Sequence, residues 1–171
     1  MKDREVVDDT SEDGRYTYRL VRGRRPGVGQ TLTFVLLNPP LNPSIFDRAA
    51  VVRCRKIAQR DGYERATIVY LCALRLDDSR DLPNRPDAVG SENERYLRMA
   101  LHDAHDGGWP VVCAWGELAP MADVLRFRHL TTQYPGLRLY CLGLNAHGKP
   151  RNPMRLRPDV KLERYTLPRV T

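Results

Sequence analysis

Polar residues follow each of four short apolar runs in the chain, and their types suit recognition of a planar base or an anion. They are Asn38-Pro39-Pro40, residues 72–75 ending in Arg75, Gly116-Glu117 after Trp115, and residues 143–148, which include His147. An amide donates and accepts hydrogen bonds, a guanidinium pairs with phosphate, and an indole stacks on a base. Because the carboxyl ends of parallel strands share one crevice, we predict a binding site there.

Each of these residues also has a purely structural interpretation. Asn38 and the prolines after it can simply end a strand. Trp115 can belong to the core, and His147 can lie in a solvated turn. Arg75 can cap a strand or pair with the aspartates that follow it. All of these alternatives would have to hold at the same edge of the sheet, and that coincidence favours a site.

Other candidates lie away from the strand ends. Asp47, just before the first expected helix, is either an N-cap or a general base. Asn93 is expected to support a long loop by bonding to nearby backbone. The cations expected to contact an anionic ligand are Arg53, Arg75, Lys149 and Arg151.

The apolar runs predict strands that are buried on both faces of a parallel sheet. They span residues 32–37, 66–71, 111–115 and 137–142, and segments with helical spacing lie between them at 49–59, 91–105 and 118–130. Ser91 and Glu94 predict a capping box at the second helix. The alternation implies an α/β fold, a three-layer α/β/α sandwich with a mainly parallel four-stranded sheet and an N-terminal edge strand over residues 15–21.

The length of 171 residues is typical of one domain, which we expect over residues 15–171. Residues 1–14 are polar and acidic, which predicts a frayed tail. Residues 75–90 are too long for an ordinary connector, and such stretches inside compact domains are often functional.

Composition and missing motifs exclude several classes of protein. The excess of 28 Lys and Arg over 21 Asp and Glu is mostly arginine, which suits either phosphate contacts or a solvated basic surface. Four scattered cysteines indicate reduced thiols, and no apolar run approaches the roughly 18 residues of a membrane span, so we expect a cytoplasmic protein without membrane contact. His102 and His105 lack further ligands and no dinucleotide or phosphate loop occurs, so we expect no metal and no cofactor.

Seven segments, in their order, resemble a bacterial and phage family labelled domain of unknown function 1643. The resemblance runs from about Tyr16 to Leu167 and rests on YTYRL, LLNPPLNPS, FDRAAVVRCRKIAQRDGY, IVYLCALRLDDSRDL, PDAVGSENERYL, VVCAWGE and LGLNAHGKPRNPMRL. That family is in turn similar to the uracil-DNA glycosylase superfamily, which has a small parallel-sheet α/β/α fold.

The glycosylase resemblance implies roles for two segments. Residues 37–40 resemble the motif in which an asparagine positions the attacking water, and Pro39 lies beside Asn38 there. Residues 148–153 resemble the motif that holds the leaving base and clamps DNA, which implies contacts from Lys149, Arg151 and Asn152.

This chain also departs from both patterns. Lys149 and Asn152 stand where the family of unknown function usually has histidines. The base-reading asparagine of the glycosylases falls near Tyr70 or Cys72 here. These departures leave the chain either without cleavage activity or with a different base as its substrate.

Three functions follow from these observations. The first is hydrolysis of an N-glycosidic bond in a nucleotide, modified nucleoside or nucleic acid, which predicts that Asn38→Ala abolishes turnover while leaving the fold nearly intact. The second is a non-catalytic module that binds a nucleotide or nucleic acid. The third is a protein-interaction domain that uses residues 75–90, for a partner that the sequence does not identify.

Overall fold

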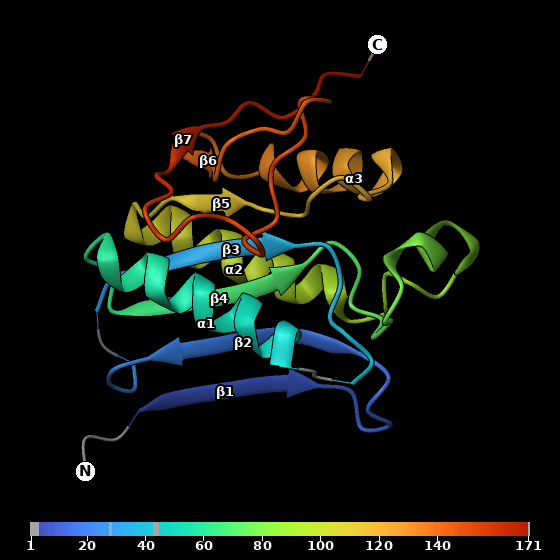
Figure 1. Cartoon of the computed structure of the whole chain (residues 1–171), viewed down its shortest axis with the longest axis horizontal. Helices are drawn as coiled ribbons and strands as arrows, with labels where there is room; N and C mark the ends of the chain where they lie inside the picture. The colour runs from blue at the N-terminus through green and yellow to red at the C-terminus, as the bar shows by residue number, and fades with distance from the viewer. Residues whose placement is uncertain (1–3, 28, 43–44, 171) are drawn as a thin grey trace.

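A seven-stranded mixed sheet, in the order β1-β2-β4-β3-β5-β6-β7, forms the centre of the protein in the computed structural model (Figure 1). The structure describes residues 4–27, 29–42 and 45–170, with backbone alone for residues 45–48. Four neighbouring strands are parallel: β4 (Arg65–Tyr70), β3 (Thr31–Leu36), β5 (Val111–Cys113) and β6 (Leu139–Cys141). Antiparallel strands complete both edges, with β1 (Glu5–Thr10) and β2 (Thr17–Gly23) on one side and β7 (Glu163–Arg164) on the other.

The α/β class is confirmed, but the expected extent of the sheet is wrong. The predicted edge strand is β2, which lies inside the sheet between β1 and β4. The predicted frayed tail is wrong for residues 5–10, because their acidic side chains pair with arginines on neighbouring strands. Asp9 lies opposite Arg19 with its carboxylate 2.7 Å from Nε, and Glu5 Oε2 lies 2.8 Å from Arg65 Nε.

Helices cover both faces of the sheet, as Figure 1 shows. Helix α1 (Ile45–Arg60) packs on one face, and α2 (Asn93–Gly107) and α3 (Met121–Thr131) pack on the other. Successive residues of a strand point to opposite faces, so Phe34 joins the core beneath α1 and Val35 joins the core beneath α2 and α3. Coverage on both sides explains why β3 is apolar throughout.

The expected capping box at the second helix is wrong. Helix α2 begins two residues after Ser91, its N-cap is Glu92, and no side chain caps it. Glu94 instead accepts hydrogen bonds from Arg98, one turn further along, at 2.7 and 3.0 Å. An i,i+4 ion pair on an exposed helix surface satisfies the carboxylate that the box would have used.

The order of the parallel strands creates a natural crevice. After β3 the chain passes through α1 to β4 on one side, and it then returns through α2 to β5 on the other side of β3. The connections from the carboxyl ends of β3 and β5 therefore diverge, which is where ligands bind in open α/β sheets. None of the helices in the described part of the chain is long and apolar enough to cross a membrane.

Candidate functional site

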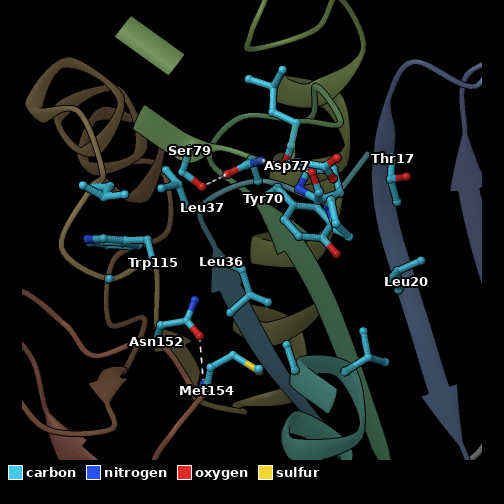
Figure 2. Close-up of a pocket in the computed structure, with 18 of the residues that line it drawn as sticks. Thr17, Leu20, Leu36, Leu37, Tyr70, Asp77, Ser79, Trp115, Asn152 and Met154 are labelled. Carbon is cyan, nitrogen blue, oxygen red and sulfur yellow. Dashed lines mark hydrogen bonds between the residues drawn. The ribbon is translucent and has the colours of Figure 1, made fainter. Parts of the chain in front are cut away.

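A cavity of about 700 Å³ lies at the carboxyl ends of β3 and β5, and it extends beneath α1 toward β2 (Figure 2). Its walls come from the N-terminal hairpin, the end of β3, the first half of α1, the turn after β5 and the segment that carries Asn152 and Met154. The lining residues are Asp8, Thr10, Thr17, Leu20, Arg22, Leu36, Leu37, Asn38, Pro39, Pro40, Ala50, Val51, Val52, Tyr70, Leu76, Asp77, Ser79, Trp115, Gly116, Glu117, Leu118, Asn152 and Met154.

The cavity is largely apolar, and its charged groups are mostly acidic. Asp8, Asp77 and Glu117 contribute carboxylates, and Arg22 is the one cation among the lining residues. Arg22 Nη1 lies 2.7 Å from an oxygen of Asp8 and also donates to the carbonyls of Val7 and Val21. Because its guanidinium is already engaged, the described lining residues present no free cation to a phosphate group.

Asn38 lies at the mouth of the crevice, and its side chain bonds to the protein at both ends. Its amide nitrogen donates to the carbonyls of Pro39 at 3.0 Å and Leu76 at 3.1 Å. Its amide oxygen accepts from Ser79 Oγ at 2.8 Å. Both donors are used, and the oxygen keeps one lone pair for a ligand or a water.

The loop after β4 forms the upper wall of the cavity in Figure 2. Asp77 Oδ1 accepts from the backbone N–H groups of Leu41 at 3.1 Å and Asn42 at 3.3 Å. These bonds, with the Asn38–Ser79 bond, join residues 76–79 to the chain that follows β3. The loop therefore forms a fixed wall, and its side chains leave the cavity open.

Trp115 and Gly116, two of the predicted site residues, line the cavity, although Trp115 does not offer an open stacking surface. The indole is 2% exposed and packs edge-to-face against Phe127 and Tyr165. Gly116 has a φ of +81°, and a Cβ there would lie 3.4 Å from the Cβ of Asn152. Glycine at this position therefore allows the turn after β5 to approach the segment that carries Asn152.

Asn152 provides an unused hydrogen-bond donor in the cavity. Its Oδ1 accepts from the backbone N–H of Met154 at 2.9 Å, which fixes the amide plane. Its Nδ2 points toward Trp115 in Figure 2 and donates to no other described residue. Asn38 and Asn152, from the two segments that the sequence singled out, thus line the same cavity.

Three predicted binding residues lie outside the cavity and have structural contacts. Arg53 donates to the carbonyl of Leu156, and Arg75 donates to the carbonyls of Pro40 and Gly14. Asn93 is fully buried. Its Nδ2 donates to the carbonyl of Tyr70, the last residue of β4, at 2.9 Å and to that of Leu71 at 3.1 Å. The side-chain bonds of Asn93 therefore join α2 to the end of β4 and not to the long loop that precedes the helix.

Glu117, at the rim of the cavity, contacts His147 and Lys149, two further residues that the sequence predicted to bind a ligand. His147 Nδ1 lies 2.9 Å from its carboxylate, and Lys149 Nζ donates to its backbone carbonyl at 2.8 Å. Asn145 Nδ2 also donates to its carboxylate. Arg151 is exposed and lies beside Gly143, without an ion-pair partner among the described residues. His147, Lys149 and Arg151 therefore lie around the opening and do not line the interior.

Asp47 falls within α1, which begins at Ile45, so it is not the N-cap that the sequence suggested. Its side chain lies outside the part of the chain that the structure describes. The general-base interpretation of Asp47 therefore stays a prediction.

Sequence reasoning missed several lining residues. They reach the cavity through the strand order and the path of the long loop, which the local sequence does not show. Tyr70 ends β4, and Ser79 and Asp77 follow it in the long loop, which the sequence marked only as unusual. Asp8, Thr10 and Thr17 reach the cavity because β1 and β2 join the sheet beside β4. Because residues 1–14 were predicted to be a frayed tail, no lining residue was expected among them.

The thiols in this structure are poorly suited to nucleophilic chemistry. All four cysteines are free and buried. Burial raises the pKa of Cys72 to about 12 and raises the pKa of Cys54, Cys113 and Cys141 as well. Within residues 4–27, 29–42 and 45–170, no three His, Cys, Asp or Glu side chains are grouped to hold a metal.

Residues 17–154 match the model of a family described as protein of unknown function (DUF1643). The chain belongs to this family. The DUF1643 match contains every lining residue of the cavity except Asp8 and Thr10.

No curated protein matches the chain. Among solved structures, the chain is similar to hetero-hexameric glutamate dehydrogenase from Thermus thermophilus in its leucine-bound form, at 12% identity and a TM-score of 0.32. That match covers 79% of this chain and 31% of the dehydrogenase chain, and the TM-score is too low to indicate a common fold.

Proposed function

We propose that the cavity binds the base of a nucleoside, nucleotide or nucleic acid. The observation that carries this proposal is the lining itself, in which apolar walls surround a few fixed polar groups at the switch point of a parallel sheet. A base is a planar, mostly apolar ring with a polar edge. Asn152 Nδ2 offers a donor to such an edge, and Asp77 and the free lone pair of Asn38 offer acceptors.

The charges of the lining favour the base as the buried part of the ligand. A phosphate inside would face Asp8, Asp77 and Glu117, with no free cation among the described lining residues. At a few ångströms, like charges in a partly buried site repel by several kcal/mol. Sugar and phosphate groups are therefore expected to remain at the opening, where Lys149 and Arg151 lie.

Hydrolysis of the bond between base and sugar is the enzymatic form of this proposal. The resemblance to uracil-DNA glycosylases supports it, together with the place of Asn38 after β3 and its one unused lone pair, which can accept from a water. Binding without cleavage is the alternative, favoured by the two donors of Asn38 that are already committed to carbonyls. In both forms of the proposal, with or without cleavage, the ligand can be part of a nucleic acid.

The test is a calorimetric binding series with free bases, nucleosides and nucleotides, followed by mass detection of released base. Ala50→Trp should block the cavity and reduce affinity at least tenfold, because Ala50 lines it from α1. Gln59→Trp is the matched control, because Gln59 lies on the same helix, is uncharged and does not line the cavity. Equal affinities for the two variants would contradict the proposal.

Released base that depends on Asn38 would establish hydrolysis. Binding without any release would leave the non-catalytic form. Absence of binding for every base-containing ligand would exclude the cavity as a base site.

A further inference from the structure

A stripe of positive charge runs beside the cavity, and we name it the basic ridge. It consists of residues 53–60 of α1 and residues 151–161 of the C-terminal segment. The two pieces lie side by side, because Arg53 donates to the carbonyl of Leu156 and Arg60 Nη1 donates to that of Pro158 at 3.1 Å. Leu156 and Val160 pack onto the core beneath α1, which holds the segment against the helix.

The charge of the ridge is strongly unbalanced. Its cations are Arg53, Arg55, Lys56, Arg60, Arg151, Arg155, Arg157 and Lys161. The nearby carboxylates are Asp61 and Asp159, which lie 2.8 Å from Arg60 and 3.5 Å from Arg157. Residues 49–61 and 151–162 thus hold a net six positive charges in a chain whose total is +7. Most of the net positive charge of the protein is therefore carried by these two segments.

Four of these cations are fully available to a partner. Lys56, Arg151, Arg155 and Lys161 are exposed, and none forms an ion pair within the described ranges. Six of the eight cations of the ridge are arginines, whose guanidinium groups bind phosphate through two parallel hydrogen bonds. The composition of the ridge therefore suits repeated phosphate groups.

The ridge starts at the rim of the cavity. Ala50, Val51 and Val52 line the cavity, and the cations of α1 follow directly along the same helix. Asn152 and Met154 line it from the other piece, and Arg151 and Arg155 are their neighbours in the chain. Residues 50–60 extend for about 15 Å at 1.5 Å per residue, which exceeds the reach of a single phosphate.

We propose that the basic ridge binds the phosphate backbone of a single-stranded nucleic acid, one base of which enters the cavity. The insertion of a base rests on the proposed function above, whereas the backbone contacts rest on the charge of the ridge. An unpaired strand is required because a base inside a duplex cannot reach an enclosed site without leaving the stack. The cavity then reads the base, and the ridge selects a polymer over a free nucleoside.

The surface of the ridge argues against a membrane as its partner. A helix that lies on a lipid surface needs large apolar side chains that insert beside its basic ones. Val52, at 38%, is the most exposed apolar side chain on α1 among residues 49–60, and it lines the cavity. On the described C-terminal piece, Leu156 and Val160 face the core.

The experiment measures fluorescence anisotropy of a labelled single-stranded oligonucleotide, as DNA and as RNA, across a salt series. Four available cations predict a slope of log affinity against log salt near −3, at about 0.7 released ions per single-strand contact. The double variant Arg151→Gln/Arg155→Gln should flatten this slope by about 1.4 and weaken binding about 10- to 30-fold near 0.1 M salt.

The control variant changes the total charge by the same amount at a distant place. Arg95 and Arg98 lie on α2, which covers the opposite face of the sheet from α1, and neither lines the cavity. Arg95→Gln/Arg98→Gln should bind the oligonucleotide like the unmodified protein. Equal weakening by the two double variants would mean that net charge alone acts, which overturns the proposal.

The remaining outcomes separate the ridge from the cavity. Nucleoside binding that Ala50→Trp blocks, without salt-dependent binding of the oligonucleotide, overturns the ridge and leaves the proposed function intact. Oligonucleotide binding that depends on Arg151 and Arg155 but is unchanged by Ala50→Trp supports the ridge and overturns base insertion. Binding to vesicles of phosphatidylcholine and phosphatidylserine, with none to the oligonucleotide, overturns the choice of nucleic acid.

Discussion

Ser79 donates its hydroxyl hydrogen bond to Asn38, with 2.8 Å between Ser79 Oγ and Asn38 Oδ1, and so joins the loop after β4 to the end of β3. Forty-one positions separate the two residues in the chain. The bond occupies one of the two lone pairs on the Asn38 amide oxygen, and both residues line the cavity. Ser79 therefore controls how much of Asn38 a ligand can use.

Replacing Asn38 with alanine is expected to destabilise the fold by about 1–3 kcal/mol, because the Leu76 carbonyl loses its side-chain donor. This differs from the expectation of a nearly intact fold that the sequence suggested. Ser79→Ala is the sharper variant, since it frees the amide oxygen at a cost of about 1 kcal/mol and keeps both donors of Asn38 in place. Chemical denaturation gives the free energies of unfolding, and calorimetry shows whether ligand affinity changes with Ser79.

The four thiols should resist alkylation in the native protein. Burial excludes the reagent, and the raised pKa of Cys72, about 12, leaves almost no thiolate at pH 8. We expect no labelling by iodoacetamide over minutes under native conditions and four labels in denaturant, counted by intact mass. Rapid native labelling of one cysteine would reveal an accessible nucleophile and contradict this packing.

Acid should release the long loop from the N-terminal hairpin. Hydrogen bonds from Arg85 and Arg15 hold the pKa of Asp87 below its ordinary value of 3.8. A lowered pKa in the folded state gives stability that is present above pH 4 and lost as the pH falls further. Hydrogen exchange of the Leu74 amide, which donates to the Ala88 carbonyl, should therefore accelerate below pH 4 relative to the intrinsic exchange rate at each pH.

Asp87→Asn should produce the same acceleration at neutral pH. Asp78→Asn removes the same charge, but the contacts of Asp78 stay within its own turn, with Arg80. Its exchange at Leu74 should match that of the unmodified protein. Equal acceleration in both variants would assign the effect to net charge and not to the tether.

Arg155→Gly should stabilise the protein while weakening any contact of the ridge with phosphate. Arg155 has a φ of +63°, a left-handed conformation that costs a residue with a Cβ roughly 1–2 kcal/mol. Glycine removes this cost but loses about 0.5–1 kcal/mol through its freer unfolded chain. A rise in Tm of a few degrees is expected, and a fall would indicate that the guanidinium makes a stabilising contact.

The parallel core was predictable from the sequence because its runs are apolar on both faces, and β3, β4, β5 and β6 lie where the apolar runs were found. The strand β1 was not predictable in the same way. Its carboxylates resemble those of a disordered tail until Arg19 and Arg65 are placed opposite them. The structural role of these carboxylates depends on arginines that are distant in the sequence. The composition of residues 5–10 alone does not reveal that role.

The candidate site divides along the same line. Asn38, Pro39, Trp115 and Gly116 were singled out because each follows a predicted strand, and Asn152 because residues 148–153 resemble a glycosylase motif; all five line the cavity. Arg75 also follows a strand and Arg53 was chosen as a cation, but the structure uses both to bind backbone carbonyls. A polar residue near a sheet edge serves either purpose, and only the position of its neighbours decides between them.

Strand β1 gives the cavity a wall that lies outside the matched part of the chain. Asp8 and Thr10 lie before residue 17, where the match to the family begins, whereas the polar groups at the carboxyl ends of the strands lie inside it. Exchange of Asp8 or Thr10 is expected to leave the sheet edge that carries Asn38 and Trp115 in place. The preference of the cavity for one ligand over another can then be altered from one outer strand without changing the groups at the crevice.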